Sequence, residues 1–170
     1  MLVNNDRSPL TVSSPQELRR AFQSLIRRFG LLDPDRTPCG HSLTVSHAHA
    51  LMELLNGPGL RQLDLARTLG LSKSAVCRMV EQLEQRGWIL RQADEQDGRA
   101  CRLRLSVRGA ELARRIDADS LARFADILDH VPAARRREVI AALELLQGAI
   151  PAAARTSPAA RRARRIGVSS

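Results

Sequence analysis

The segment between Leu60 and Ser106 constrains the fold more than any other part of the chain. Its apolar and polar residues are spaced in a way that predicts a short helix, a tight turn and a second helix. Gly70 lies in the turn, where a residue without a side chain adopts the positive φ that a sharp reversal needs. Ser72 follows as an N-cap for the second helix. These residues predict a helix-turn-helix.

A hairpin is expected directly after the second helix. The helices are predicted at 61–69 and 72–86, and short strands at 88–92 and Cys101–Leu105. A polar turn at 94–98 joins the two strands. Together these elements predict a winged helix-turn-helix in a mainly α (α+β) fold, a shape that reads double-stranded DNA. The apolar stripe of the second helix consists of Val76, Met79, Val80 and Leu83.

Amphipathic helices are predicted on both sides of this unit. The first, at Pro15–Phe29, has five large apolar residues on one face at helical spacing. A helix at 44–55 follows a loop, and helices at Val107–Asp129 and from Pro132 onward come after the hairpin. The positions expected to face the core are Val45, Ala48, Met52 and Leu55 in the 44–55 helix and Leu63, Ala66 and Leu69 in the 61–69 helix.

Charge and cysteine content agree with an intracellular DNA-binding protein. The net charge is +9, and the last twenty residues hold five of the 27 basic side chains and none of the 18 acidic ones. Excess positive charge favours nucleic acid or anionic surfaces. The three cysteines are sparse and odd in number, which argues against a disulfide framework. No apolar run reaches the ~20 residues of a membrane span, so a cytoplasmic location is expected.

The outer side of the 72–86 helix carries the residues predicted to meet the major groove. In helix-turn-helix proteins the N-terminal end of this helix contacts base edges. Lys73 can reach guanine acceptors, Ser74 is permissive, and Ala75 can contact a thymine methyl group. Arg78 is one turn further along, where it can reach a phosphate or a base, and Cys77 lies beside it.

The hairpin carries a second group of candidate DNA contacts. Arg99 is at the predicted tip, where an arginine can enter a narrow minor groove. Asp97 is two residues earlier and is placed to pair with Arg99. Arg102 and Arg104 share one face of the following strand. We expect Asp97, Arg99 and Arg102 to take part in binding DNA.

The flanking helices predict a homodimer. Their apolar stripes are longer than a small core requires, and a long helix can bury such a stripe against a second copy. Readers of duplex DNA are often two-fold symmetric, with half-sites one helical turn apart.

These motifs make the sequence similar to the MarR family of bacterial transcriptional regulators. The resemblance is close over about 50 residues, and the helix order extends it to roughly 15–150. It implies a triangular homodimer joined by its terminal helices, a pseudo-palindromic operator, and release by a small aromatic or phenolic ligand. The ligand pocket implied lies between the dimer helices and the DNA-binding lobe. The matching stretches are Leu60 to Ala66, Leu71 to Val80, Leu83 to Arg91, Asp97 to Arg99 and Leu105 to Gly109.

The resemblance also divides the chain into expected regions. Two positions and the tail depart from the family pattern: Arg61 replaces the usual Thr or Ser cap of the third helix, Cys77 replaces a common Thr, and an arginine-rich tail begins at Arg155. The expected regions are a flexible N-terminus (1–14), a winged helix-turn-helix domain (15–150) and a basic, disordered tail (151–170). Within the domain we expect a DNA-binding lobe at about 44–106 and dimerisation helices at about 15–30 and 107–150.

Other functions remain open from the residues alone. Cys39, His41, His47 and His49 fall within eleven residues and could bind zinc, although His47 and His49 point to different sides of one helix. The simpler interpretation is that these residues form the polar start of the second helix, with one histidine near the ligand pocket.

The remaining alternatives concern redox sensing, protein binding and catalysis. Cys77 and Cys101 could respond to oxidation. A winged helix can also serve as a protein-interaction module. The chain has no Gly-rich phosphate loop, nucleophile elbow or paired-carboxylate pattern, so no enzyme and no cofactor are predicted.

Overall fold

The computed structural model describes residues 14–93 and 101–156, and side chains as far as Pro151. The chain divides into two compact units, Met1–Leu121 and Ala122–Ser170. The boundary falls within one long helix, α5. The elements in chain order are α1 (Pro15–Phe29), α2 (Val45–Asn56), β1 (Leu60–Arg61), α3 (Gln62–Leu69), α4 (Lys73–Gln85), β2 (Ile89–Ala93), β3 (Cys101–Leu105), α5 (Val107–Asp129), η1 (Ala133–Arg135) and α6 (Arg136–Thr156).

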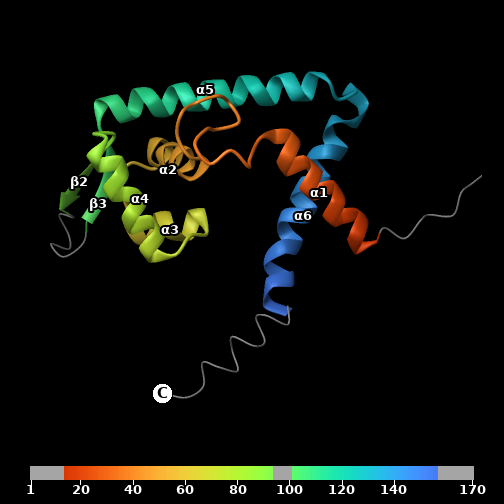
Figure 1. The fold of residues 1–170 in the computed structure, drawn as a ribbon, viewed down its shortest axis with the longest axis horizontal. Coiled ribbons are helices and arrows are strands. Elements are labelled where there is room, and N and C mark those ends of the chain that lie inside the picture. Colours follow the sequence, from red (N-terminus) through yellow and green to blue (C-terminus); the bar gives the residue numbers. More distant parts are fainter. Residues whose placement is uncertain (1–13, 94–100, 157–170) are drawn as a thin grey trace, which may run out of the picture. The chain divides into compact units, whose positions relative to one another are not determined.

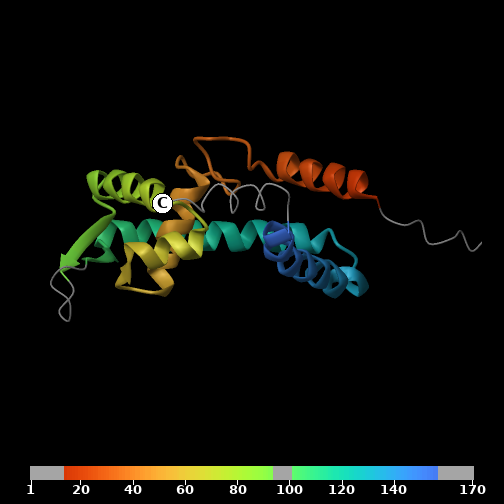
Figure 2. The same cartoon turned by 90° about the horizontal axis from the view of Figure 1, so that it is seen from below.

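The first unit contains a small antiparallel sheet with the strand order β1-β3-β2 (Figure 1). Strands β2 and β3 form the wing, with Ile89 opposite Leu105 and Ala93 opposite Cys101. Strand β1 is only two residues long and pairs with the other edge of β3. Both Figure 1 and Figure 2 show the wing beside the N-terminal end of α5. The sheet therefore ties the helix-turn-helix to the start of α5.

The core of this unit lies between α2, α3, α4, the strands and the first turns of α5. Alternation along β3 buries Leu103 completely and leaves Arg104 exposed. The largest fully buried side chains are Leu51, Leu54, Leu65, Leu83, Ile89, Leu103, Ile116, Val76 and Val80.

The predicted apolar stripe of α4 is confirmed, and those of α2 and α3 are partly wrong. Val76, Met79, Val80 and Leu83 are all buried. In α2, however, the fully buried leucines are Leu51 and Leu54, while Val45, Met52 and Leu55 are only half-buried. In α3, Leu65 is buried and Leu63 is 49% exposed. Both helices have neighbours on more than one side, so a single periodic stripe does not describe their contacts.

The junction between the wing and α5 depends on a close backbone approach at Gly109. The Ser106 hydroxyl donates to the Gly87 carbonyl at 2.6 Å and accepts from the Gly109 amide at 3.0 Å. A Cβ atom on Gly109 would lie 1.8 Å from the carbonyl oxygen of Trp88. Only glycine permits this contact, which holds the base of the wing against the first turn of α5.

Helix α1 is well capped but contributes no buried residue to the first unit. The Ser14 side chain accepts from the Glu17 amide, and the Glu17 carboxylate accepts from the Ser14 amide, which forms a capping box. Its apolar face is open: Leu18, Phe22 and Leu25 are 54%, 44% and 51% exposed. The helix is therefore defined by local capping and not by packing.

The second unit contains the end of α5, the short helix η1 and α6. Arg136 stabilises the turn between α5 and α6, because its guanidinium donates to the Val131 carbonyl and to the Asp129 carboxylate at 3.2 Å. Large apolar side chains on α6 are exposed, among them Ile140 and Leu145.

Helix α6 runs to Thr156, past the boundary expected at residue 150. The alanines after Pro151 favour helix, and residues 157–170 of the predicted tail lie outside the described residues. Among the residues described, no helix is long and apolar enough to cross a membrane.

Candidate nucleic-acid interface

The turn between α3 and α4 has the geometry expected from its sequence. Gly70 ends α3 in the left-handed region with a φ of 64°. The Leu71 amide donates to the Ala66 carbonyl at 3.0 Å, which closes the turn. The Ser72 hydroxyl then accepts from the Ala75 amide at 3.2 Å and caps α4. The start of α4 is therefore set by the glycine on one side and the serine cap on the other.

Arg61 does not cap α3 through its side chain, in keeping with its departure from the family pattern. Helix α3 nevertheless begins at the next residue, Gln62. The backbone of Arg61 pairs with Arg102 in β3, so a strand contact orients the start of the helix where a side-chain cap is absent.

The predicted recognition residues lie together on the outer, N-terminal part of α4. Lys73, Ser74 and Arg78 are exposed, whereas Ala75 and Cys77 are half-buried. The Ser74 hydroxyl lies 3.1 Å from that of Ser72, at the tip of the helix. The opposite face is fully inside the core, so α4 can present only this side to a partner.

The basic groups of this surface are free to bind an anion. Among the residues that the structure describes, no hydrogen bond or ion pair engages the charged ends of Lys73 and Arg78. Other arginines nearby are already paired: Arg67 with Asp64 at 3.1 Å and Arg91 with Glu84 at 2.9 Å. Lys73 and Arg78 thus leave two positive charges without an ion pair at the end of α4 that would enter a groove.

A buried histidine connects α2 to α4. His47 Nε2 lies 3.0 Å from the Gln82 amide oxygen, and Nδ1 lies 2.6 Å from the Thr44 hydroxyl. Because the amide oxygen only accepts, Nε2 carries the proton and the neutral ring accepts from Thr44 at Nδ1. Burial lowers the pKa of His47 from 6.5, Gln82 opposes this shift, and the charge of Arg86 adds to it. From the residues alone, His47 is a candidate zinc ligand or part of a polar entry to α2, and its separation of 35 residues from Gln82 does not predict this contact.

The wing arginines have different environments. Arg102 is half-buried near the start of β3, and its Nη1 donates to the Gly59 carbonyl at 3.1 Å, which ties β3 to the residue before β1. Arg104 is exposed on β3. Asp97 and Arg99, the predicted minor-groove pair, lie outside the described residues. The structure therefore brings together the predicted residues of α4 and places Arg102 near the start of β3, opposite Gln92 and away from the junction with α5.

The predicted cysteine and histidine cluster is dispersed. Cys39 Sγ lies 3.3 Å from the Thr37 hydroxyl, and His41 Nε2 donates to the Asp119 carboxylate of α5 at 2.8 Å. His47 faces α4, and His49 is exposed on α2. Within the described parts of the chain, no three His, Cys, Asp or Glu side chains are grouped to hold a metal ion. Cys77 donates to Glu81 at 3.4 Å on the same helix.

Comparisons with known proteins agree with this geometry. A model of the MarR family matches residues 41–100, which contain α2, the helix-turn-helix and β2. An HTH-type transcriptional repressor of Mycobacterium tuberculosis is 33% identical over 104 residues, 61% of this chain and 75% of the relative. The chain belongs to the MarR family. A repressor of Mycobacterium bovis matches this MarR protein with the same identity and coverage.

Solved MarR-like structures share the winged helix-turn-helix fold. PcaV of Streptomyces coelicolor, solved with its natural ligand, has a TM-score of 0.63 and 24% identity, covering 81% of this chain and 94% of PcaV. FabT of Streptococcus pneumoniae, solved with DNA, has a TM-score of 0.70 and 17% identity, covering 81% of this chain and 98% of FabT. The protein is thus a transcriptional regulator with the fold of DNA-binding repressors, and its relatives are regulators and not enzymes.

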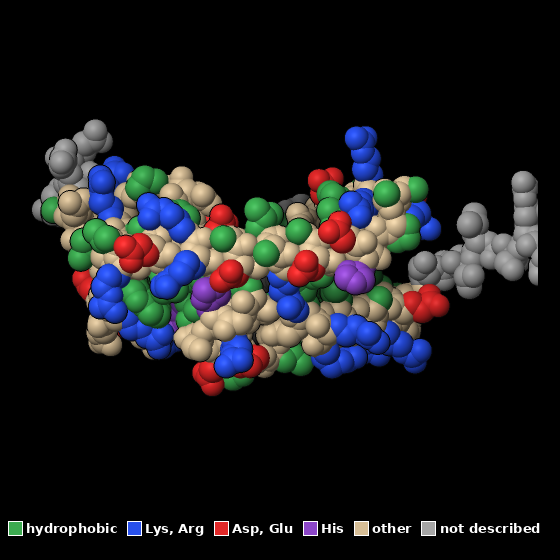
Figure 3. Space-filling model, turned by 90° about the horizontal axis from the view of Figure 1, so that it is seen from above, with side chains coloured by type: hydrophobic (Ala, Val, Ile, Leu, Met, Phe, Trp, Pro, Cys, Tyr) green, Lys and Arg blue, Asp and Glu red, His purple; other side chains and the backbone are tan. Residues whose placement is uncertain are grey.

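Figure 3 looks onto α5, away from the recognition surface. Acidic, basic and apolar side chains are mixed along this helix. A row of basic side chains lines α1, whose arginines are exposed on the side away from its apolar face. In this MarR protein the face over α5 is therefore a mixed surface.

Proposed function

We propose that this regulator is a homodimeric repressor that binds a two-fold symmetric operator in duplex DNA and leaves it when a small ligand binds. The orientation of α4 is the observation that carries the proposal. One face of α4 lies completely in the core, and the other presents Lys73, Ser74 and Arg78 at its N-terminal end. This end enters the major groove in helix-turn-helix proteins.

Each residue of the surface has a proposed part in binding. Lys73 and Arg78 supply the positive charge that duplex DNA attracts, and Ser74, Ala75 and Cys77 lie close enough to the helix tip to meet base edges. Arg99 would enter the adjacent minor groove, steadied by Asp97. Arg102 would act near the backbone of the DNA from the start of β3.

The open apolar faces support the homodimer. Phe22 and Leu25 on α1 and Ile140 and Leu143 on α6 are each more than two-fifths exposed. Apolar side chains of this size are stabilised when a partner removes them from water, by about 25 cal/mol per Å² of apolar surface. A second copy of the chain would cover them and give the two-fold symmetry that paired half-sites require.

The ligand response is supported by the relatives. PcaV, which shares the fold, was solved with its natural ligand. In this chain we propose a small aromatic or phenolic effector. Its binding would change the separation of the two α4 helices in the dimer and so weaken binding to half-sites at fixed spacing.

Selection of binding sites from a random duplex pool tests the proposal. Enrichment of a symmetric site, with half-sites about one helical turn apart, is expected. Arg78→Ala and Arg99→Ala should each weaken binding to the selected site by about 1–3 kcal/mol. Arg114→Ala, an equal loss of charge at an exposed position of α5, is the matched control and should have little effect. No enrichment by a folded dimer, with or without candidate ligands, would argue for a winged fold that binds proteins.

A further inference from the structure

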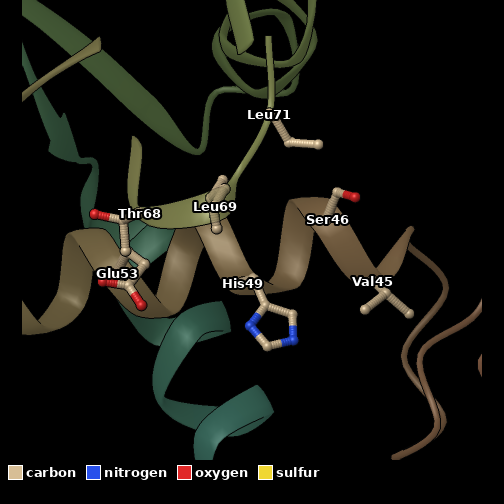
Figure 4. Close-up of a pocket in the computed structure, with 7 residues that line it drawn as sticks. All are labelled: Val45, Ser46, His49, Glu53, Thr68, Leu69 and Leu71. Carbon is tan, nitrogen blue, oxygen red and sulfur yellow. The ribbon is translucent and has the colours of Figure 1, made fainter. Parts of the chain in front are cut away.

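A half-open groove lies within the DNA-binding lobe, between α2 and the end of α3 (Figure 4). It has a volume of about 260 Å³. All of its walls belong to the first unit. Its lining residues come from α2, α3 and the turn after α3, whereas the pocket that the family resemblance implies lies between the dimer helices and the DNA-binding lobe. The lining residues are Val45, Ser46, His49, Glu53, Thr68, Leu69 and Leu71.

The groove is polar at one end and apolar at the other. Figure 4 shows the Glu53 carboxylate and the Thr68 hydroxyl close together at one end. Leu69 lies near the centre, and Val45 and Leu71 lie toward the other end. An occupant would therefore need a hydrogen-bonding group at one end and an apolar body behind it.

Glu53 determines the sign of the charge that fits. Its side chain is half-buried, and among the described residues no hydrogen bond or ion pair engages its carboxylate. A carboxylate accepts hydrogen bonds and cannot donate them while ionised. Partial removal from water without a partner is unfavourable, and a cationic donor would relieve it. The same charge disfavours a carboxylate or phenolate ligand.

We propose that this groove binds a small organic cation, a protonated amine with a compact apolar body. The ammonium group would lie against Glu53 and Thr68, and the body would cover Leu69 and Leu71. The volume suits a molecule of roughly ten non-hydrogen atoms, below the usual range of drug-sized pockets. A metal ion does not fit as well, because only Glu53 and His49 offer charged or imidazole ligands there.

The position of the groove links its occupant to the recognition helix. Leu69 and Leu71 flank Gly70 in the turn that leads into α4, and the Ser72 cap follows immediately. On the other wall, His49 is two residues from His47, which bonds to Gln82 of α4. An occupant would therefore contact both segments that orient α4. Its effect on operator binding rests on the proposed function, whereas its binding does not.

Titration of the full-length protein with phenethylamine, in the absence of DNA, tests the site. The size-matched neutral and anionic probes are 2-phenylethanol and phenylacetate. We expect saturable binding of the amine alone, with amide chemical-shift changes concentrated at Val45, Ser46, His49, Glu53 and residues 68–71. Glu53→Gln should weaken amine binding about tenfold or more. Glu111→Gln, at an exposed position on α5, is the matched control and should leave it unchanged.

A second variant and a second readout separate the outcomes. Thr68→Phe adds a ring at an exposed helix position and should fill the groove while keeping Glu53. Equal binding of amine and phenylacetate, or amine binding that survives both variants, would overturn the site. If the amine binds at these residues but leaves affinity for the selected operator unchanged, the site stands and its link to α4 is refuted. Failure to select any operator bears on the proposed function alone.

Discussion

Helices α4 and α1 have similar amphipathic sequences and lie in opposite environments. Val76, Val80 and Leu83 of α4 are completely buried, whereas Leu18, Phe22 and Leu25 of α1 are about half exposed. The apolar face of α4 is covered within one molecule by α2, α3 and the sheet. That of α1 is not. An amphipathic pattern thus predicts that a face will be covered, but not whether the cover comes from the same chain.

The largest expected effect is in α4. Leu83→Ala removes a fully buried side chain and should lower the free energy of unfolding by about 2–5 kcal/mol. Leu25→Ala in α1 is the matched control: it removes the same atoms from a side chain that is 51% exposed. Chemical denaturation at several protein concentrations distinguishes the two variants. A loss of stability that comes from a weaker dimer contact depends on protein concentration, whereas a loss within one molecule does not. Equal, concentration-independent losses would contradict the comparison.

Two helical glycines provide the next contrast. Gly109→Ala should cost about 3 kcal/mol, because the new Cβ would overlap the Trp88 backbone and separate the wing from α5. Gly148→Ala is the control in α6, where a Cβ added to the glycine would have no atom of another part of the chain within 4 Å. It should stabilise the protein by about 0.5–1 kcal/mol, as alanine favours helix over glycine. Thermal unfolding of the two variants should therefore shift in opposite directions.

A charge on α1 tests whether its open face is a dimer contact. Phe22→Asp should raise the dimer dissociation constant about a hundredfold, or ~2.7 kcal/mol, because an unpaired carboxylate would be buried. Gln23→Asp adds the same charge at an exposed position outside the apolar face. Sedimentation equilibrium should show dissociation of the first variant only, with the helical content of both preserved. An unchanged dimer in Phe22→Asp would show that α1 is covered by something else.

The smallest effect concerns pH and the contact between α2 and α4. Burial lowers the pKa of His47 in the folded protein, whereas the unfolded chain keeps a value near 6.5. The unfolded state therefore takes up the proton first as the pH falls. The contribution of neutral His47 to the free energy of unfolding is fully present above pH 6.5. It declines as the pH falls from 6.5 to the lowered pKa of the folded state. Denaturation of wild type and His47→Gln between pH 5 and 8 measures this.

The glutamine variant sharpens that measurement. Its side-chain amide can still donate to Gln82 but does not titrate, so its acid-dependent loss should be smaller than that of the wild type. Parallel pH profiles for the two proteins would mean that another group controls the acid response.

Local sequence determined much of this protein. The caps at Ser14 and Ser72, the reversal at Gly70 and the stripe of α4 depend on residues within a few positions of one another. Backbone hydrogen bonds and side-chain periodicity over such distances follow from the sequence directly. The outward position of Lys73, Ser74 and Arg78 follows from the same stripe, because residues on the other side of a helix whose apolar face is buried must face out.

Only the tertiary structure decided the contacts between distant segments. It placed Arg102 on the Gly59 carbonyl, His47 on Gln82 and Gly109 against Trp88, and it added β1, which is too short to be recognised by alternation. It also decided which leucines of α2 and α3 are buried, since each of these helices has several neighbours. Such contacts join residues far apart in the chain, so their geometry depends on how whole elements pack and not on spacing along the sequence.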